Sequence, residues 1–143
     1  MRSPRRLLTL ASLLLAACGG ADSDRSAASG DAAPAPAAAA VPSTGTVIEI
    51  TMHTDEKGNY FSPAEIEAHP GDLLRFKLVQ GVHNVHFLPD SNPGRTGLPA
   101  ASAFAQLPGQ TIDVPLTFGT GKFYFQCDPH AALGMVGRVE VER

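Results

Sequence analysis

The chain has 143 residues, 14 glycines, 12 prolines, no tryptophan and a formal net charge of −3. This length allows one small domain, and the mildly acidic balance argues against nucleic-acid binding and favours a basic partner. The abundance of glycine and proline beside many apolar residues is typical of a small all-β domain with many turns.

The first 17 residues have the pattern of a lipoprotein signal peptide. Three arginines precede an apolar run at residues 7–17, which is too short to form a stable membrane span. The sequence Leu-Ala-Ala-Cys at 15–18 resembles the lipobox of bacterial lipoproteins, which implies lipidation of Cys18. We therefore expect an exported protein, lipid-anchored on the periplasmic side of a bacterial membrane. An ordinary secretory signal is the alternative.

Lipidation of Cys18 would leave Cys127 as the only free thiol of the chain. A lone thiol in an exported protein cannot form an intrachain disulfide, so it is either a liability or a ligand. Removal of the signal peptide would also remove three arginines, which takes the formal net charge from −3 to −6.

Residues 18–45 consist mainly of alanine, proline, serine and glycine, with almost nothing to bury. This composition predicts a disordered tether, and a flexible chain of that length has a root-mean-square span of roughly 30 Å. The composition changes at residue 46, so we expect one folded domain over residues 46–143.

Short apolar runs separated by turn residues fill this domain. The clearest run is 73–78, where Leu74, Phe76 and Leu78 alternate with two basic residues after a Pro-Gly-Asp turn signal. The predicted strands are 46–52, 66–69, 73–78, 82–88, 111–116, 122–127 and 136–141. This pattern predicts an all-β, antiparallel two-sheet sandwich.

The sequence FYFQCDPHAALGMVG at 123–137 combines three kinds of metal ligand. Cys127 ends a predicted strand, and His130 and Met135 follow in a tight loop. A thiolate, an imidazole and a thioether form a soft donor set that favours copper, and two imidazoles with a thiolate and a weak axial thioether are typical of blue-copper electron-transfer sites. Zinc is disfavoured because a thioether is a poor zinc ligand, and the Cys-x-x-Cys-His motif of c-type haem is absent.

The second imidazole has two candidates in the segment 81–87, His83 and His86. On a strand, His83 shares the apolar face with Val85 and Phe87, whereas Asn84 and His86 point the other way. We therefore predict that His83 is the ligand and interpret His86 as a surface or hydrogen-bonding histidine.

These motifs resemble the plastocyanin/pseudoazurin branch of the cupredoxins. The shared features are the His83-Asn84 pair and the Cys-x₂-His-x₄-Met spacing, followed by Gly-x-Val. The resemblance covers residues 46–143 and implies a Greek-key sandwich of about eight strands with one type I copper ion at one end. It also implies that Asn84 connects the two ligand loops by hydrogen bonding. The loop at 89–103 departs from the family, with SNPGRTG in place of the usual acidic stretch.

Four protein ligands leave no open position for a substrate, which predicts an electron carrier and not an enzyme. We also expect the protein to be a monomer. The small and apolar residues around His130, together with Leu98 and Pro99, predict an apolar patch for transient docking of redox partners. The alternative function is a copper-binding lipoprotein for storage or delivery, although the chain has only three methionines. A sandwich that has lost its copper site is a third interpretation.

Overall fold

The computed structural model describes residues 45–143, so the predicted signal peptide, Cys18 and the tether up to residue 44 lie outside the described residues. No helix within residues 45–143 is long and apolar enough to cross a membrane. The strands are β1 (Val47–Asp55), β2 (Gly58–Ser62), β3 (Glu65–Ala68), β4 (Leu73–Leu78), β5 (Thr111–Pro115), β6 (Gly121–Gln126) and β7 (Val136–Val141). The short 3₁₀ helices are η1 (Pro89–Ser91) and η2 (Asp128–Leu133).

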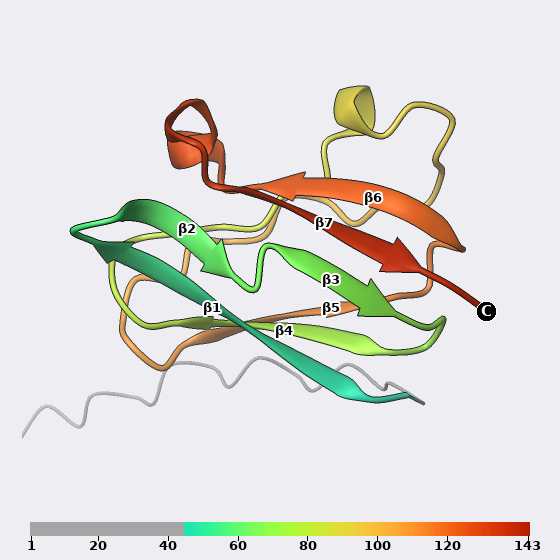
Figure 1. Cartoon of the computed structure of the whole chain (residues 1–143), viewed down its shortest axis with the longest axis horizontal. Helices are drawn as coiled ribbons and strands as arrows, with labels where there is room; N and C mark the ends of the chain where they lie inside the picture. Colours follow the sequence, from blue (N-terminus) through green and yellow to red (C-terminus); the bar gives the residue numbers. More distant parts are fainter. Residues whose placement is uncertain (1–44) are drawn as a thin grey trace, which may run out of the picture. The chain divides into compact units, whose positions relative to one another are not determined.

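The strands form two layers, one sheet of order β2-β1-β4-β5 and another of order β3-β7-β6 (Figure 1). The all-β, two-sheet class is therefore confirmed. The sheets are mixed and not antiparallel throughout, because β1 pairs with β4 in parallel and β3 pairs with β7 in parallel. Parallel neighbours need a crossover connection. Between β1 and β4 the chain forms β3 in the other sheet, and between β3 and β7 it forms β4 and β5 in the other sheet.

The core lies between the two sheets and contains the apolar face of each strand. In β4, Leu74, Phe76 and Leu78 are buried, whereas Arg75 and Lys77 alternate with them on the outer face. Arg75 forms a bidentate ion pair with Asp113 of β5. Polar contacts therefore connect β4 and β5 on the outer face, while the inner face is apolar.

Phe125 lies at the centre of the core. Its ring centroid is 5.0 Å from that of Phe61, 5.2 Å from that of Phe76 and 5.4 Å from that of Phe87. The first two pairs are edge-to-face, a geometry that adds to the stabilisation from burial. Gly137 leaves the room for this ring, because a Cβ there would collide with Phe125.

The structure differs from the predicted strands in two places. Residues 82–88 are not a strand: they make only isolated bridges, because the Val85 N–H donates to the Ser102 side chain and its carbonyl accepts from the Ser102 N–H. Strand β2 was not predicted, since its sequence GNYFS contains turn-forming residues and only Phe61 is buried. It forms by antiparallel pairing with β1.

Replacement of Phe125 by alanine in the metal-free protein should lower the free energy of unfolding by about 3–5 kcal/mol, because it leaves a cavity in the core. Denaturant unfolding measures this change. The matched control is Phe104→Ala, which removes a ring that is 48 % exposed and should cost under about 1 kcal/mol. Equal losses for the two variants would contradict the central place of Phe125.

Candidate metal centre

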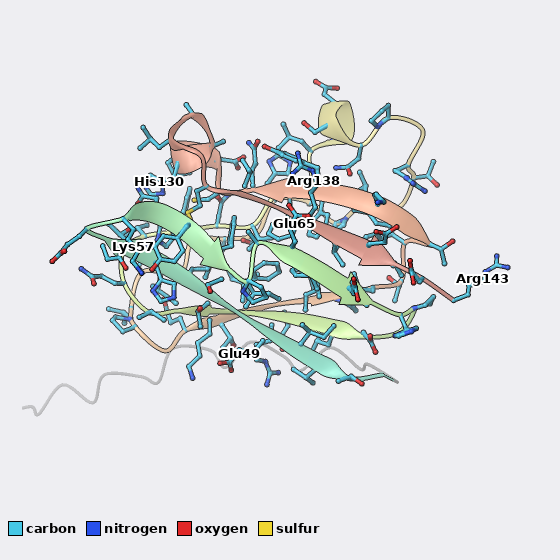
Figure 2. All side chains as sticks on the ribbon, in the orientation of Figure 1. Glu49, Lys57, Glu65, His130, Arg138 and Arg143 are labelled. Atoms are coloured by element: carbon cyan, nitrogen blue, oxygen red, sulfur yellow. The ribbon has the colours of Figure 1, made fainter. Side chains whose placement is uncertain are left out.

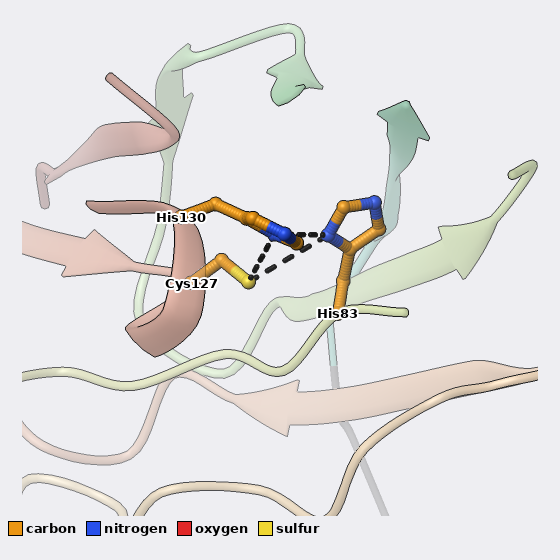
Figure 3. Close-up of side chains that lie close together, drawn as sticks. All are labelled: His83, Cys127 and His130. Atoms are coloured by element: carbon orange, nitrogen blue, oxygen red, sulfur yellow. Dashed lines mark hydrogen bonds between the residues drawn. The ribbon is translucent and has the colours of Figure 1, made fainter. Parts of the chain in front are cut away.

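Three of the predicted ligands meet at one end of the sandwich. The Cys127 Sγ lies 3.4 Å from the His130 Nδ1 and 3.6 Å from the His83 Nδ1, and the two Nδ1 atoms are 3.2 Å apart. Figure 3 shows the three side chains directed at one another. A point equidistant from the three atoms lies about 2.0 Å from each, which is the length of a metal–imidazole bond. The donor set and its spacing therefore fit a single transition-metal ion.

Backbone hydrogen bonds fold the ligand loop back on itself. The Cys127 N–H donates to the Met135 carbonyl at 3.1 Å, and the Met135 N–H donates to the His130 carbonyl at 3.1 Å. The loop turns at Gly134, whose φ of +92° lies in the left-handed region that glycine adopts without strain. Met135 is fully buried, as Cys127 is, and these two backbone hydrogen bonds hold its backbone beside those of Cys127 and His130.

The polar contacts of His83 fix its orientation and its tautomer. Its Nε2 lies 3.1 Å from the Gln80 carbonyl and 3.1 Å from the Thr54 hydroxyl. Because a carbonyl only accepts, Nε2 carries the hydrogen, and Nδ1 presents its lone pair to Cys127. A Cβ at Gly81 would collide with the Thr54 hydroxyl and approach the His83 ring, so glycine is required beside this ligand.

Burial favours the uncharged forms of Cys127 and His83 in the metal-free protein. It raises the pKa of the Cys127 thiol and lowers the pKa of the His83 imidazole. At neutral pH the site therefore holds a thiol and an uncharged imidazole. A metal ion must displace the thiol proton when it binds, which makes binding pH-dependent.

Asn84 connects the two ligand loops. Its Nδ2 donates to the Asp128 carboxylate at 2.8 Å, and the Asp128 N–H donates to its Oδ1 at 2.8 Å. His86 lies on the same side, with its Nδ1 3.0 Å from the Asp128 carboxylate, and it is not in the cluster with Cys127. The structure thus places His83, and not His86, with the thiol.

Asp128 was not among the predicted site residues. Burial of its carboxyl raises its pKa, but hydrogen bonds from Asn84, Gln126 and His86 outweigh that effect and hold the pKa below its ordinary value. The sequence carried only part of the signal, because it shows a carboxylate directly after the ligand cysteine but not which side chains lie beside it.

A shallow depression adjoins His130. Figure 2 places His130 on η2, and the side chain is half-buried, whereas Cys127, His83 and Met135 are fully buried. The lining contains no aspartate, glutamate, lysine or arginine and consists of Thr54, Asn59, Gly81, Val82, Phe104, Gln106, Pro129 and His130. The predicted Leu98 is absent from this lining and packs partly buried against the core.

A family model described as copper binding proteins of the plastocyanin/azurin family matches residues 48–142. The chain therefore belongs to that family. The predicted cupredoxin resemblance and copper as the cofactor are thereby confirmed.

Individual relatives agree with this assignment. Plastocyanin of Prochlorothrix hollandica is 36 % identical over 107 residues, which cover 72 % of this chain and 79 % of that protein. A pseudoazurin structure from Methylobacterium extorquens is 28 % identical with a TM-score of 0.50, covering 66 % of this chain and 74 % of that one. A pseudoazurin structure from Hyphomicrobium denitrificans has a TM-score of 0.57 at 21 % identity, covering 68 % of this chain and 77 % of that one, and supports the fold alone.

The stability of the metal-free protein should fall as the pH drops below about 6.5. Burial lowers the pKa of His83 in the folded state, so the unfolded chain binds more protons over this range and stability rises with pH. Denaturant unfolding between pH 5 and 8 measures the slope, which His83→Gln should flatten. His69→Gln is the control, because the His69 side chain is 72 % exposed. An unchanged slope in His83→Gln would contradict the prediction.

Proposed function

We propose that the protein is a one-electron carrier in which His83, Cys127, His130 and Met135 hold one type I copper ion. The observation that carries the proposal is the closed cluster of one Sγ and two Nδ1 atoms, all within 3.6 Å of one another. Bound copper would supply the Cu(II)/Cu(I) couple at this position. Because hydrogen bonds of the surrounding backbone fix the ligand side chains, the site needs little rearrangement between the two oxidation states.

The arrangement of the ligands favours a carrier over an enzyme. Cys127, His83 and Met135 have no exposed surface, and with His130 they would fill the coordination sphere of the metal. A catalytic metal site keeps one position open for water or substrate. Electron transfer needs no such position, because only the electron passes between the partners.

The copper-loaded protein should be blue, with an intense visible absorption band from thiolate-to-copper charge transfer, and should give a reversible one-electron wave in voltammetry. Cys127→Ser should abolish the band because it removes the thiolate. His86→Gln is the matched control and should retain the band, since its ring lies outside the cluster. Wild-type protein that binds copper tightly and remains colourless would refute the proposed site.

Redox partners would approach at the depression beside His130. Of the ligand side chains this imidazole is the one that is not fully buried, and Val82 and Phe104 beside it are 47 % and 48 % exposed. An apolar face without fixed charges suits a small, transient contact that tolerates changes in ionic strength.

Val82→Lys should slow electron self-exchange between two copies of the protein by roughly tenfold, because two lysines would then meet at the contact. Val47→Lys is the matched control: its side chain is 48 % exposed at the start of β1, and it should exchange at the native rate. Nuclear magnetic resonance line widths in mixtures of oxidised and reduced protein give the rate. Equal rates for both variants would place the contact elsewhere.

Copper storage or delivery is the alternative function. The full burial of Cys127, His83 and Met135 argues against rapid exchange of the metal with an acceptor. Fast transfer of copper to a competing chelator, without a reversible redox wave, would support this alternative instead of electron transfer.

We also propose a cellular location for the protein. The signal-like residues 1–17 and the lipobox-like Cys18 support an exported protein with a lipid anchor on the periplasmic side of a bacterial membrane. The following Ala/Pro/Ser-rich residues would give the domain reach toward membrane-associated redox partners.

A further inference from the structure

A second surface depression lies along β6 and shares no residue with the one beside His130. Three of the residues that line it are cations, and none is an aspartate or a glutamate. The lining consists of Ser91, Asn92, Pro93, Arg95, Lys122, Phe123, Tyr124 and Arg138. The charge of this basic depression is therefore opposite in sign to the net charge of the chain, which is −3.

The three cations come from segments that are far apart in the sequence. Arg95 lies in the loop after η1, Lys122 in β6 and Arg138 in β7. The loop belongs to the stretch 89–103, which departs from the family resemblance. The side chains of Lys122 and Arg138 are 73 % and 57 % exposed. All three positive charges are thus accessible from solvent at one place.

The guanidinium of Arg95 is held in a defined position. Its Nη1 donates to the Thr120 carbonyl at 2.8 Å, and its Cζ lies 4.8 Å from the ring centroid of the buried Phe123. Gly121 leaves room for it, because a Cβ there would collide with the guanidinium. A guanidinium has five N–H donors, so the single bond to Thr120 leaves others for an anion. Since the group is already ordered, binding would cost little side-chain entropy.

The loop that presents Arg95 is fixed against β6 by the buried side chain of Asn92. The Asn92 Nδ2 donates to the carbonyls of Leu88 at 2.8 Å and Tyr124 at 2.9 Å. The Tyr124 N–H donates to the Asn92 Oδ1 at 2.7 Å. The basic depression is therefore formed before any partner binds.

The carboxylates nearest to the cations lie outside the basic depression. The Lys122 Nζ is 3.0 Å from Glu140, and the Arg138 guanidinium is 3.3 Å from Glu65 (Figure 2). Exposed pairs of this kind contribute little free energy, so a partner can compete for the cations. Glu65, Glu67 and Glu140 line another hollow of the same sheet face. A flat anionic membrane would meet these three carboxylates, whereas an acidic side chain of a protein can enter the basic depression alone.

We propose that the basic depression is a docking site for a partner protein that carries clustered carboxylates. Arg95 would bind one carboxylate through two N–H groups, and Lys122 and Arg138 would attract its neighbours and steer the encounter. The inference goes beyond the proposed function, because binding at this place needs no metal and does not involve the depression beside His130.

The experiment titrates the metal-free Cys18→Ser chain, which carries no lipid, with a hexaglutamate peptide at low ionic strength. Nuclear magnetic resonance should show shifts of the amide signals at residues 95, 122 and 138, and a hexaglutamine peptide should cause none. Added salt should weaken the binding. Lys122→Gln and Arg138→Gln should each raise the dissociation constant by about three- to fivefold. Both side chains are exposed, so these variants should fold as the parent chain does.

The matched control is Lys77→Gln, which removes the same charge from the outer face of the other sheet. The Lys77 side chain is 45 % exposed, and this variant should bind hexaglutamate as the parent chain does. Arg95→Gln should weaken binding the most, because it removes the two-bond contact as well as a charge. An unchanged amide signal of Tyr124 in this variant shows that the loop has kept its place.

The outcomes separate this inference from its alternatives. Absence of hexaglutamate binding, or an equal loss in Lys77→Gln, would overturn it. Phosphatidylglycerol vesicles that bind the Cys18→Ser chain when hexaglutamate does not would identify a membrane contact and also overturn it. Failure of the wild-type protein to form the blue band would refute the copper site and leave the hexaglutamate result unaffected.

Discussion

The hydrogen bond from the Cys127 N–H to the Met135 carbonyl is the constraint on which the ligand loop depends. This bond closes the loop that contains η2, so that residues from the end of β6 and the start of β7 face the same point. The antiparallel register of β6 and β7 begins directly beside this closure, with Gln126 opposite Val136. The ladder between these strands therefore fixes the spacing of three ligand residues before any metal is present.

The site is an extension of the core. Phe125 and Cys127 share one face of the chain, so the packing that buries the phenyl ring also carries the thiol inward. The same desolvation raises the pKa of Cys127 and lowers the pKa of His83, which favours the uncharged form of both groups without metal. A metal cation would replace the proton of the thiol and stabilise the thiolate in this apolar setting, so metal affinity and pH are coupled.

Periodicity and ligand spacing predicted much of this arrangement. Strands β4 and β7 have the predicted bounds, because buried residues alternate with less buried ones from Leu74 to Leu78 and along all of β7. Strand β2 was not predicted because it forms by pairing with β1 and has no alternating apolar pattern of its own. Residues 82–88 were predicted as a strand, yet the alternation of sides still placed His83 inward and His86 outward. The contacts of Asp128 needed coordinates, since Asn84 and His86 lie 44 and 42 residues away in the sequence.

The ligand loop has an apolar side and a polar side, and η2 lies between them. On one side, Pro129 and His130 meet the apolar side chains of Val82 and Phe104. On the other, Asp128 faces a polar network that reaches the segment after His83. A partner bound over the imidazole edge would therefore leave the carboxylate in contact with water. The apolar side and the polar network can therefore change independently, because no side chain lining the depression takes part in the network.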